Sequence, residues 1–158
     1  YATITLTSDH NQISGTASND TLTGTDSIEE INGKEGNDII FGGLGQDILW
    51  GGVGKNVFKY SSTEESTLDF PDFVKDFKSG DKIDLKAIDA NVNLPGDQAF
   101  SRPKVVKDFD VESFTKPGQL VFDVLSQTLY GNVDSDPEAD FAIALLGLSK
   151  ISASDIIL

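Results

Sequence analysis

The chain has 158 residues, which is enough for one sizeable hydrophobic core and too few for two ordinary domains. Its 26 acidic residues outnumber 12 basic ones, and the formal net charge of −14 argues against nucleic acid or an anionic membrane as partner, because both need a basic surface. Cysteine is absent and His10 is the single histidine, which excludes disulfide bonds and any zinc motif with two histidines. This charge balance favours a metal cation or a strongly solvated surface instead.

Residues 1–14 are the first segment in chain order. The stretch YATITLT alternates like a strand, and the sequence has no signal-peptide pattern. We expect 1–14 to be an N-terminal strand or linker that leads in from an upstream domain. Stable membrane insertion is not expected, because no apolar run is long enough to span a bilayer.

Five repeats of nine residues, each opened by glycine, form the segment 15–59. They read GTASNDTLT, GTDSIEEIN, GKEGNDIIF, GGLGQDILW and GGVGKNVFK. The eighth position is always large and apolar, namely Leu22, Ile31, Ile40, Leu49 and Phe58. The sixth position is always acidic or an amide, namely Asp20, Glu29, Asp38, Asp47 and Asn56. A flexible Gly/Asp-rich linker is the alternative interpretation, and the apolar residue at every ninth position argues against it.

Each repeat has the chemistry of a turn followed by a short strand. Six residues rich in Gly, Asn and Asp favour a tight turn, and the next three favour a strand whose middle side chain points inward. One buried side chain per repeat contributes only ~1.5–3 kcal/mol, less than the backbone entropy that nine ordered residues lose. The sixth-position carboxylates indicate a further source of stability, a hard cation bound by oxygen atoms.

The repeats resemble the GGxGxDxUx nonapeptides of the repeats-in-toxin (RTX) family. The resemblance implies an all-β fold, with a parallel β-roll of nonapeptide repeats over about 15–59 that continues into an antiparallel β-sandwich-like cap over 60–158. It also implies about three calcium ions between loops two repeats apart, pairing 15–20 with 33–38, 33–38 with 51–56, and 24–29 with 42–47. The implied ligands, side chains or backbone carbonyls, are Gly15, Ala17, Asp20, Gly24, Asp26, Glu29, Gly33, Glu35, Asp38, Gly42, Leu44, Asp47, Gly51, Val53 and Asn56.

Two features of the repeats modify this expectation. Glu29 is longer than the usual Asp and Asn56 is uncharged, so the second and third sites should bind more weakly. The outward positions of repeats three and four are apolar, namely Ile39, Phe41, Ile48 and Trp50. Because such a row would be an exposed apolar patch, we expect the C-terminal part of the chain to pack over it.

The segment 60–158 contains three further motifs. The stretch DFVKDFKSGDKIDL resembles the segment that follows the β-roll in serralysin-type metalloproteases and related lipases. Glu65 and Asp72 would be additional calcium ligands there, with solvated charges on an edge strand as the alternative. The loop NVDSDPEAD resembles D-x-D-x-D calcium loops through Asp134 and Asp136, with an acidic hairpin as the alternative. The final SASDIIL resembles a type I export signal, with a closing strand as the alternative.

No catalytic motif is present, since the sequence lacks HExxH, GxSxG and GxxxxGK. We therefore expect a calcium-binding, non-catalytic C-terminal module of a bacterial extracellular protein, secreted without an N-terminal signal peptide. Its expected partners are calcium, the type I secretion apparatus and the upstream domain that it stabilises. The alternative is a polysaccharide-binding or adhesive module attached to an epimerase, hydrolase or RTX adhesin. The residues for that alternative are Phe41, Trp50 and the basic cluster Arg102, Lys104 and Lys107, which could equally balance nearby carboxylates.

Overall fold

The computed structural model describes residues 2–5 and 11–158, which are almost entirely strands and turns. Nine short strands come first: β1 (Ala2–Thr5), β2 (Gln12–Ser14), β3 (Asp20–Thr23), β4 (Glu30–Asn32), β5 (Ile39–Phe41), β6 (Ile48–Trp50), β7 (Val57–Lys59), β8 (Asp72–Val74) and β9 (Lys82–Asp84). Five more follow: β10 (Lys104–Val106), β11 (Leu120–Asp123), β12 (Thr128–Gly131), β13 (Phe141–Leu145) and β14 (Ile156–Ile157). Two 3-10 turns span Thr63–Glu65 and Ala153–Asp155.

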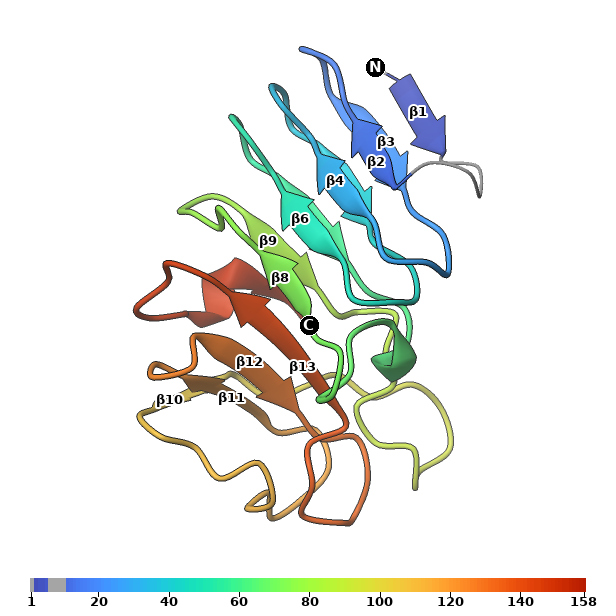
Figure 1. Cartoon of the computed structure of the whole chain (residues 1–158). Helices are drawn as coiled ribbons and strands as arrows, with labels where there is room; N and C mark the ends of the chain where they lie inside the picture. The colour runs from blue at the N-terminus through green and yellow to red at the C-terminus, as the bar shows by residue number, and fades with distance from the viewer. Residues whose placement is uncertain (1, 6–10) are drawn as a thin grey trace.

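Successive strands of the repeats alternate between two sheets. The six-stranded sheet has the order β1-β3-β5-β7-β9-β14, and all of its pairings are parallel. The eight-stranded sheet has the order β10-β11-β12-β13-β8-β6-β4-β2. Two repeats therefore make one coil, and the coils stack along the molecule (Figure 1). The predicted all-β class with a parallel β-roll is confirmed.

The two sheets extend beyond 15–59 on the N-terminal side. β1 pairs with β3 and β2 with β4, which places Ile4 beside Leu22 and Ile13 beside Ile31. The strands within the predicted 1–14 segment are thus part of the roll's sheets. Residues 1 and 6–10 of that segment lie outside the described residues.

The sheets also extend on the C-terminal side, after one longer coil. Leu49 pairs with Val74 and Phe58 with Ile83. These are steps of 25 residues (74 − 49 and 83 − 58) instead of the 18 residues between Leu22 and Ile40. The added residues form the loop that contains the turn Thr63–Glu65. β8 and β9 then resume the stacking of the nonapeptides.

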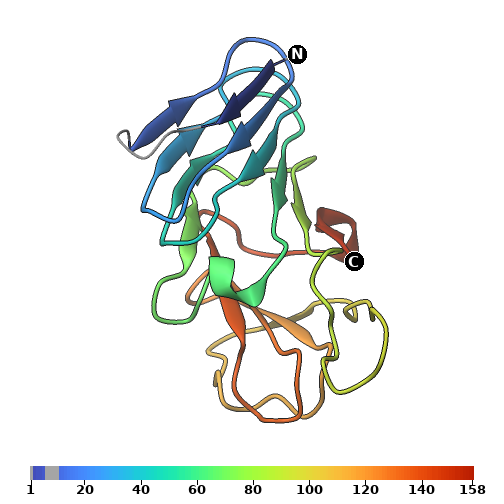
Figure 2. The ribbon, with the colours of Figure 1, turned by 90° about the vertical axis from the view of Figure 1, so that its right-hand side faces the viewer.

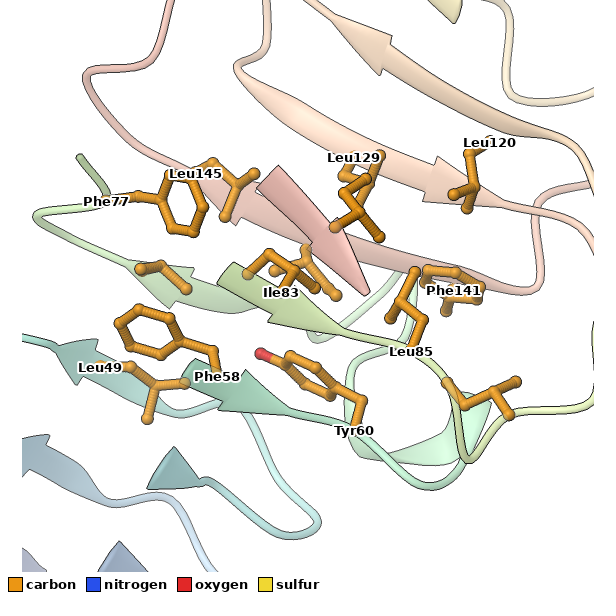
Figure 3. Packing of buried hydrophobic residues seen from close by; sticks show 14 of the residues in the cluster. Leu49, Phe58, Tyr60, Phe77, Ile83, Leu85, Leu120, Leu129, Phe141 and Leu145 are labelled. Atoms are coloured by element: carbon orange, nitrogen blue, oxygen red, sulfur yellow. The ribbon is translucent and has the colours of Figure 1, made fainter. Parts of the chain in front are cut away.

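The inward side chains of the strands form one continuous core. The eighth-position residues are at most 1% exposed, and Ile13, Val74 and Ile83 continue their column at either end. Figure 3 shows Leu49, Phe58 and Ile83 of the roll in one cluster with Leu129, Phe141 and Leu145 of the C-terminal strands. The roll and the C-terminal part therefore share a single hydrophobic interior.

The C-terminal strands sit at the end of the roll and do not cover its outer faces (Figures 1 and 2). Antiparallel pairing, which we expected throughout the cap, is limited to β11–β12 and β12–β13, while β10, β13 and β14 join their sheets in parallel. The expectation that the cap packs over the outward apolar row is wrong, because Ile39 remains 37% exposed and Trp50 half-buried. Lysine partly shields this row instead: Lys59 Nζ lies 5.8 Å from the ring centroid of Phe41.

Candidate metal sites in the loops of the roll

The sixth-position residues of the repeats stack into two columns of buried polar side chains. The first column is Asp20, Asp38, Asn56 and Asp81, and the second is Glu29, Asp47 and Asp72. All seven side chains are 2% exposed or less. Burial of so many carboxylates requires compensation, because charged groups lose solvation in a protein interior.

Within a column, one side-chain oxygen of each residue accepts a hydrogen bond from the backbone N–H of the residue above it. The Asp20 N–H donates to Asp38 Oδ1 at 2.8 Å, and the Asp38 N–H donates to Asn56 Oδ1 at 2.9 Å. The Asn56 N–H donates in turn to Asp81 Oδ1 at 2.9 Å. In the second column, the amides of Glu29 and Asp47 donate in the same way to Asp47 and Asp72, both at 2.8 Å. These bonds fix the stacking of consecutive loops.

The second oxygen of the topmost acids is bound within its own loop. The Thr16 N–H donates to Asp20 Oδ2 at 2.6 Å, and the Thr16 hydroxyl also contacts this carboxylate. The Thr25 N–H and hydroxyl donate to Glu29 in the same arrangement. Threonine at the second position of repeats one and two therefore supplies the donors.

The middle acid of each column has an oxygen without such a donor. Asp38 Oδ2 and Asp47 Oδ2 are buried and have no hydrogen-bond partner among the described residues. Their loops carry Lys34 and Gly43 at the second position, where the upper loops carry threonine. These two buried carboxyl oxygens therefore lack compensation from the chain, and either a proton or a bound cation could supply it.

The surroundings of these two oxygens suit a hard cation. A Cβ placed on Gly33 would lie 2.5 Å from Asp38 Oδ2 and 2.5 Å from the Gly51 carbonyl oxygen. A Cβ on Gly42 would lie 2.5 Å from Asp47 Oδ2. The first-position glycines therefore keep open a space lined by carboxylate and carbonyl oxygens, the ligand types that calcium takes.

Burial shifts the protonation equilibria of acids in both columns, whether or not a donor of the chain binds them. Burial raises the pKa of Asp47 to about 8, with the negative charges of Asp72 and Glu29 adding to the effect. Burial also raises the pKa of Asp72 to about 7, and it raises the pKa of Asp38 and of Asp81. A bound divalent cation would favour the charged carboxylates instead.

The other predicted roll ligands occupy two further positions. The glycines at position one, Gly15, Gly24, Gly33, Gly42 and Gly51, lie against the acids or the amide of their own loops. The residues at position three, Ala17, Asp26, Glu35, Leu44 and Val53, are exposed. Of the two alternatives in repeat two, Glu29 lies in the buried column and Asp26 does not. No group of three or more acidic or histidine side chains that could hold a metal occurs in the described ranges, so a cation here would depend on backbone carbonyls.

The predicted pair Glu65 and Asp72 make different hydrogen bonds, although the negative charge of Glu65 adds to the burial that raises the pKa of Asp72. Asp72 ends the second column, whereas Glu65 accepts hydrogen bonds from the N–H and hydroxyl of Ser61. Asp81 was not predicted as a site residue, although it ends the first column. The signal for it was present in the sequence, because Asp72 and Asp81 are nine residues apart, as are Val74 and Ile83.

The acidic loop at 132–140 is organised by its own backbone. The Asp134 N–H donates to Asn132 Oδ1, and the Asp136 N–H donates to Asp134 Oδ1. Asp140 Oδ2 accepts from the Val133 N–H at 2.7 Å. Consecutive Asx turns therefore account for the spacing of these acids, and the ligand role of Asp134 and Asp136 stays a prediction.

The residues of the polysaccharide alternative do not meet on one surface. Phe41 lies on β5 of the six-stranded sheet and Trp50 on β6 of the eight-stranded sheet. Arg102 and Lys104 line a shallow depression with Lys116 beside β10, at the far end of the eight-stranded sheet. The geometry therefore gives no continuous row of aromatic and basic side chains.

Comparisons with known proteins agree with this architecture. In the part of the chain that the structure describes, no helix is long and apolar enough to cross a membrane. The AlgE6R3 subunit of the mannuronan C5-epimerase from Azotobacter vinelandii has a similar fold, with a TM-score of 0.57 and 23% sequence identity over 92% of this chain and 76% of that one. No curated protein matches. The family model described as the C terminal of the peptidase M10 serralysins matches residues 3–158, and the chain therefore belongs to the serralysin C-terminal family.

Proposed function

We propose that the chain is a calcium-binding, non-catalytic module whose β-roll folds when calcium binds between its loops. The observation that carries the proposal is the pair of buried oxygens without hydrogen-bond partners, Asp38 Oδ2 and Asp47 Oδ2. Both lie beside first-position glycines that keep space open around them. Membership of the serralysin C-terminal family and the β-roll neighbour support the same class of module.

We rank the proposed sites by the donors that already surround each acid. Asp38, with the Gly51 carbonyl, and Asp47 would hold the tightest ions, since no donor competes for their free oxygens. This order is the reverse of the one expected from Glu29 and Asn56 in the sequence. A third ion at Asp20 and the Gly33 carbonyl would compete with Thr16 for the carboxylate. Bound calcium would supply the positive charge that the buried carboxylates lack, so that binding free energy becomes folding free energy.

The same charge pattern supports a role during export. Residues 15–59 hold seven acids and three lysines, so without calcium this segment repels itself and stays extended, as passage through a secretion channel requires. The C-terminal residues resembling an export signal form β14 and pair with β9. We propose that the type I apparatus reads them in the unfolded chain, and that folding outside the cell then supports the upstream domain.

A calcium titration followed by far-ultraviolet circular dichroism tests the proposed function. In EDTA near neutral pH we expect a spectrum that lacks most of the β-sheet signal of the loaded roll, and we expect the full signal to appear at roughly 0.1–1 mM calcium, as is usual for extracellular sites. Magnesium at the same concentration should not replace calcium, because it demands a tighter octahedral shell. An EDTA spectrum that already equals the calcium-loaded one would refute the proposal.

A further inference from the structure

The lowest acid of the first column differs from the acids above it in having a cation from the chain itself. Lys78 Nζ lies 3.2 Å from Asp81 Oδ2 and 3.3 Å from Asp81 Oδ1. The same ammonium donates to the Gly52 carbonyl oxygen at 2.5 Å. Gly52 belongs to the loop 51–56 and Asp81 to the next coil, so Lys78 joins two stacked loops through a carbonyl and a carboxylate.

A carboxylate and a carbonyl oxygen from adjacent loops are also combined at the free oxygen of Asp38, two coils higher in the column. There, the carboxylate lies beside the carbonyl of Gly51 in the following loop, and no side-chain cation is bound to it among the described residues. Asp81 is fully buried, whereas the Lys78 side chain is 42% exposed and reaches in from the surface. Both oxygens of Asp81 also accept backbone N–H bonds, from Asn56 and from Lys78, so the Lys78 ammonium adds the positive charge that these neutral donors do not bring to the buried carboxylate.

Two further contacts bind the segment 76–81 to the loop 51–56 above it. The Gly51 and Gly52 amides donate to the Asp76 carboxylate at 2.7 and 2.8 Å. The segment therefore binds the amides of this loop through the Asp76 carboxylate and its Gly52 carbonyl through the Lys78 ammonium. The second column ends similarly, because the Tyr60 hydroxyl donates to Asp72 Oδ2 at 2.9 Å. Each column thus ends on an acid that a donor of the chain satisfies.

We propose that Lys78 is a tethered cation that takes the place of a calcium ion at the end of the first column. The last layer of the roll, formed by β7 and β9, then assembles without metal and is the surface on which the calcium-dependent layers stack. This inference rests on the proposed function for the layers above, but the state of the last layer without metal can be measured separately.

Amide hydrogen exchange in EDTA tests the role of Lys78. In the wild-type chain we expect protection of the Asn56 N–H, bound to Asp81, and of the Lys82 N–H, bound to the Asn56 carbonyl. Lys78→Met keeps most of the length of the side chain without its charge, and exchange at these amides should accelerate about tenfold or more. Lys78→Arg should restore protection. Lys75→Met is the matched control, because Lys75 is exposed and lies over the Phe73 ring.

Calorimetric calcium titration of Lys78→Ala gives a second readout. The shorter side chain frees the Gly52 carbonyl and Asp81, so this variant should bind one calcium ion more than the wild type, whereas Lys78→Met should not. Equal exchange in the wild type, Lys75→Met and Lys78→Met, or an unchanged ion count in Lys78→Ala, would overturn the inference. If the circular dichroism spectrum of the wild type does not change with calcium while the Lys78-dependent protection is present, the result would count against the proposed function alone.

Discussion

Replacing Asp38 and Asp47 together by asparagine is expected to abolish the calcium response of the roll while increasing its order without calcium. Asn56 shows how an amide fits this position, since its Oδ1 accepts from the Asp38 N–H and its Nδ2 donates to the Gly52 carbonyl at 3.4 Å. The double variant would keep the inter-loop hydrogen bonds and lose two buried charges. Any calcium-dependent folding that remains at other sites should need at least about ten- to hundredfold more calcium than in the wild type.

Circular dichroism during a calcium titration measures both effects on the same sample. The matched control is Asp69→Asn with Asp97→Asn, which makes the same charge change at two exposed acids and should follow the wild type. A double variant at 38 and 47 that folds with unaltered calcium dependence would show that these carboxylates are not ligands. A variant that stays unfolded in both EDTA and high calcium would contradict the expected gain of order without metal.

The metal-free chain is expected to gain β-structure as the pH falls from 8.5 to 5. In the folded state the pKa of Asp47 is raised to about 8 and that of Asp72 to about 7, from a usual 3.8. The folded state therefore retains protons that the unfolded chain releases, and its stability is complete below about pH 4 and is lost as the pH rises through 7 to 8. Each retained proton changes the free energy of unfolding by on the order of 1 kcal/mol per pH unit within that window.

The β-sheet signal in circular dichroism, recorded in EDTA at a series of pH values, measures this dependence. In calcium the slope should reverse, because protons compete with the cation for the same carboxylates. Asp47→Asn removes one titrating group and should flatten the metal-free slope, whereas Asp97→Asn should not. Stability without metal that rises with pH between 5 and 8 would contradict the assignment of these buried acids.

The repeat alone predicts the geometry of the roll. Its glycine, its acidic or amide residue and its large apolar residue each recur every nine positions, and together they fix the turn and the inward side chain. The full extent of the roll was harder to predict. Ile4 and Ile13 continue the apolar spacing of nine, but their coils lack the glycines that marked the repeat. Val74 and Ile83 continue the apolar spacing on the C-terminal side, but only after a coil of 25 residues. A search for a fixed repeat of nine residues therefore loses the register at this coil.

Which acids are left without a donor could not be read from the repeat pattern. Asp20 and Asp38 are the same residue at the same position of their repeats, yet Asp20 is bound by Thr16 and Asp38 is left with a free oxygen. At the lower end the donors Tyr60 and Lys78 come from non-repetitive sequence, and only the folded chain brings them to Asp72 and Asp81. The ligand types follow from the sequence, whereas the ranking of the sites depends on these tertiary contacts.

A calcium anomalous difference map from crystals of the loaded protein tests the central claim most directly. Bound ions should give peaks within 2.3–2.6 Å of Asp38 Oδ2 and of Asp47 Oδ2, the usual calcium–oxygen distance. No peak should appear between Gly52 and Asp81, where Lys78 lies. Ions found only elsewhere on the molecule, with both of these buried oxygens uncoordinated, would contradict the account.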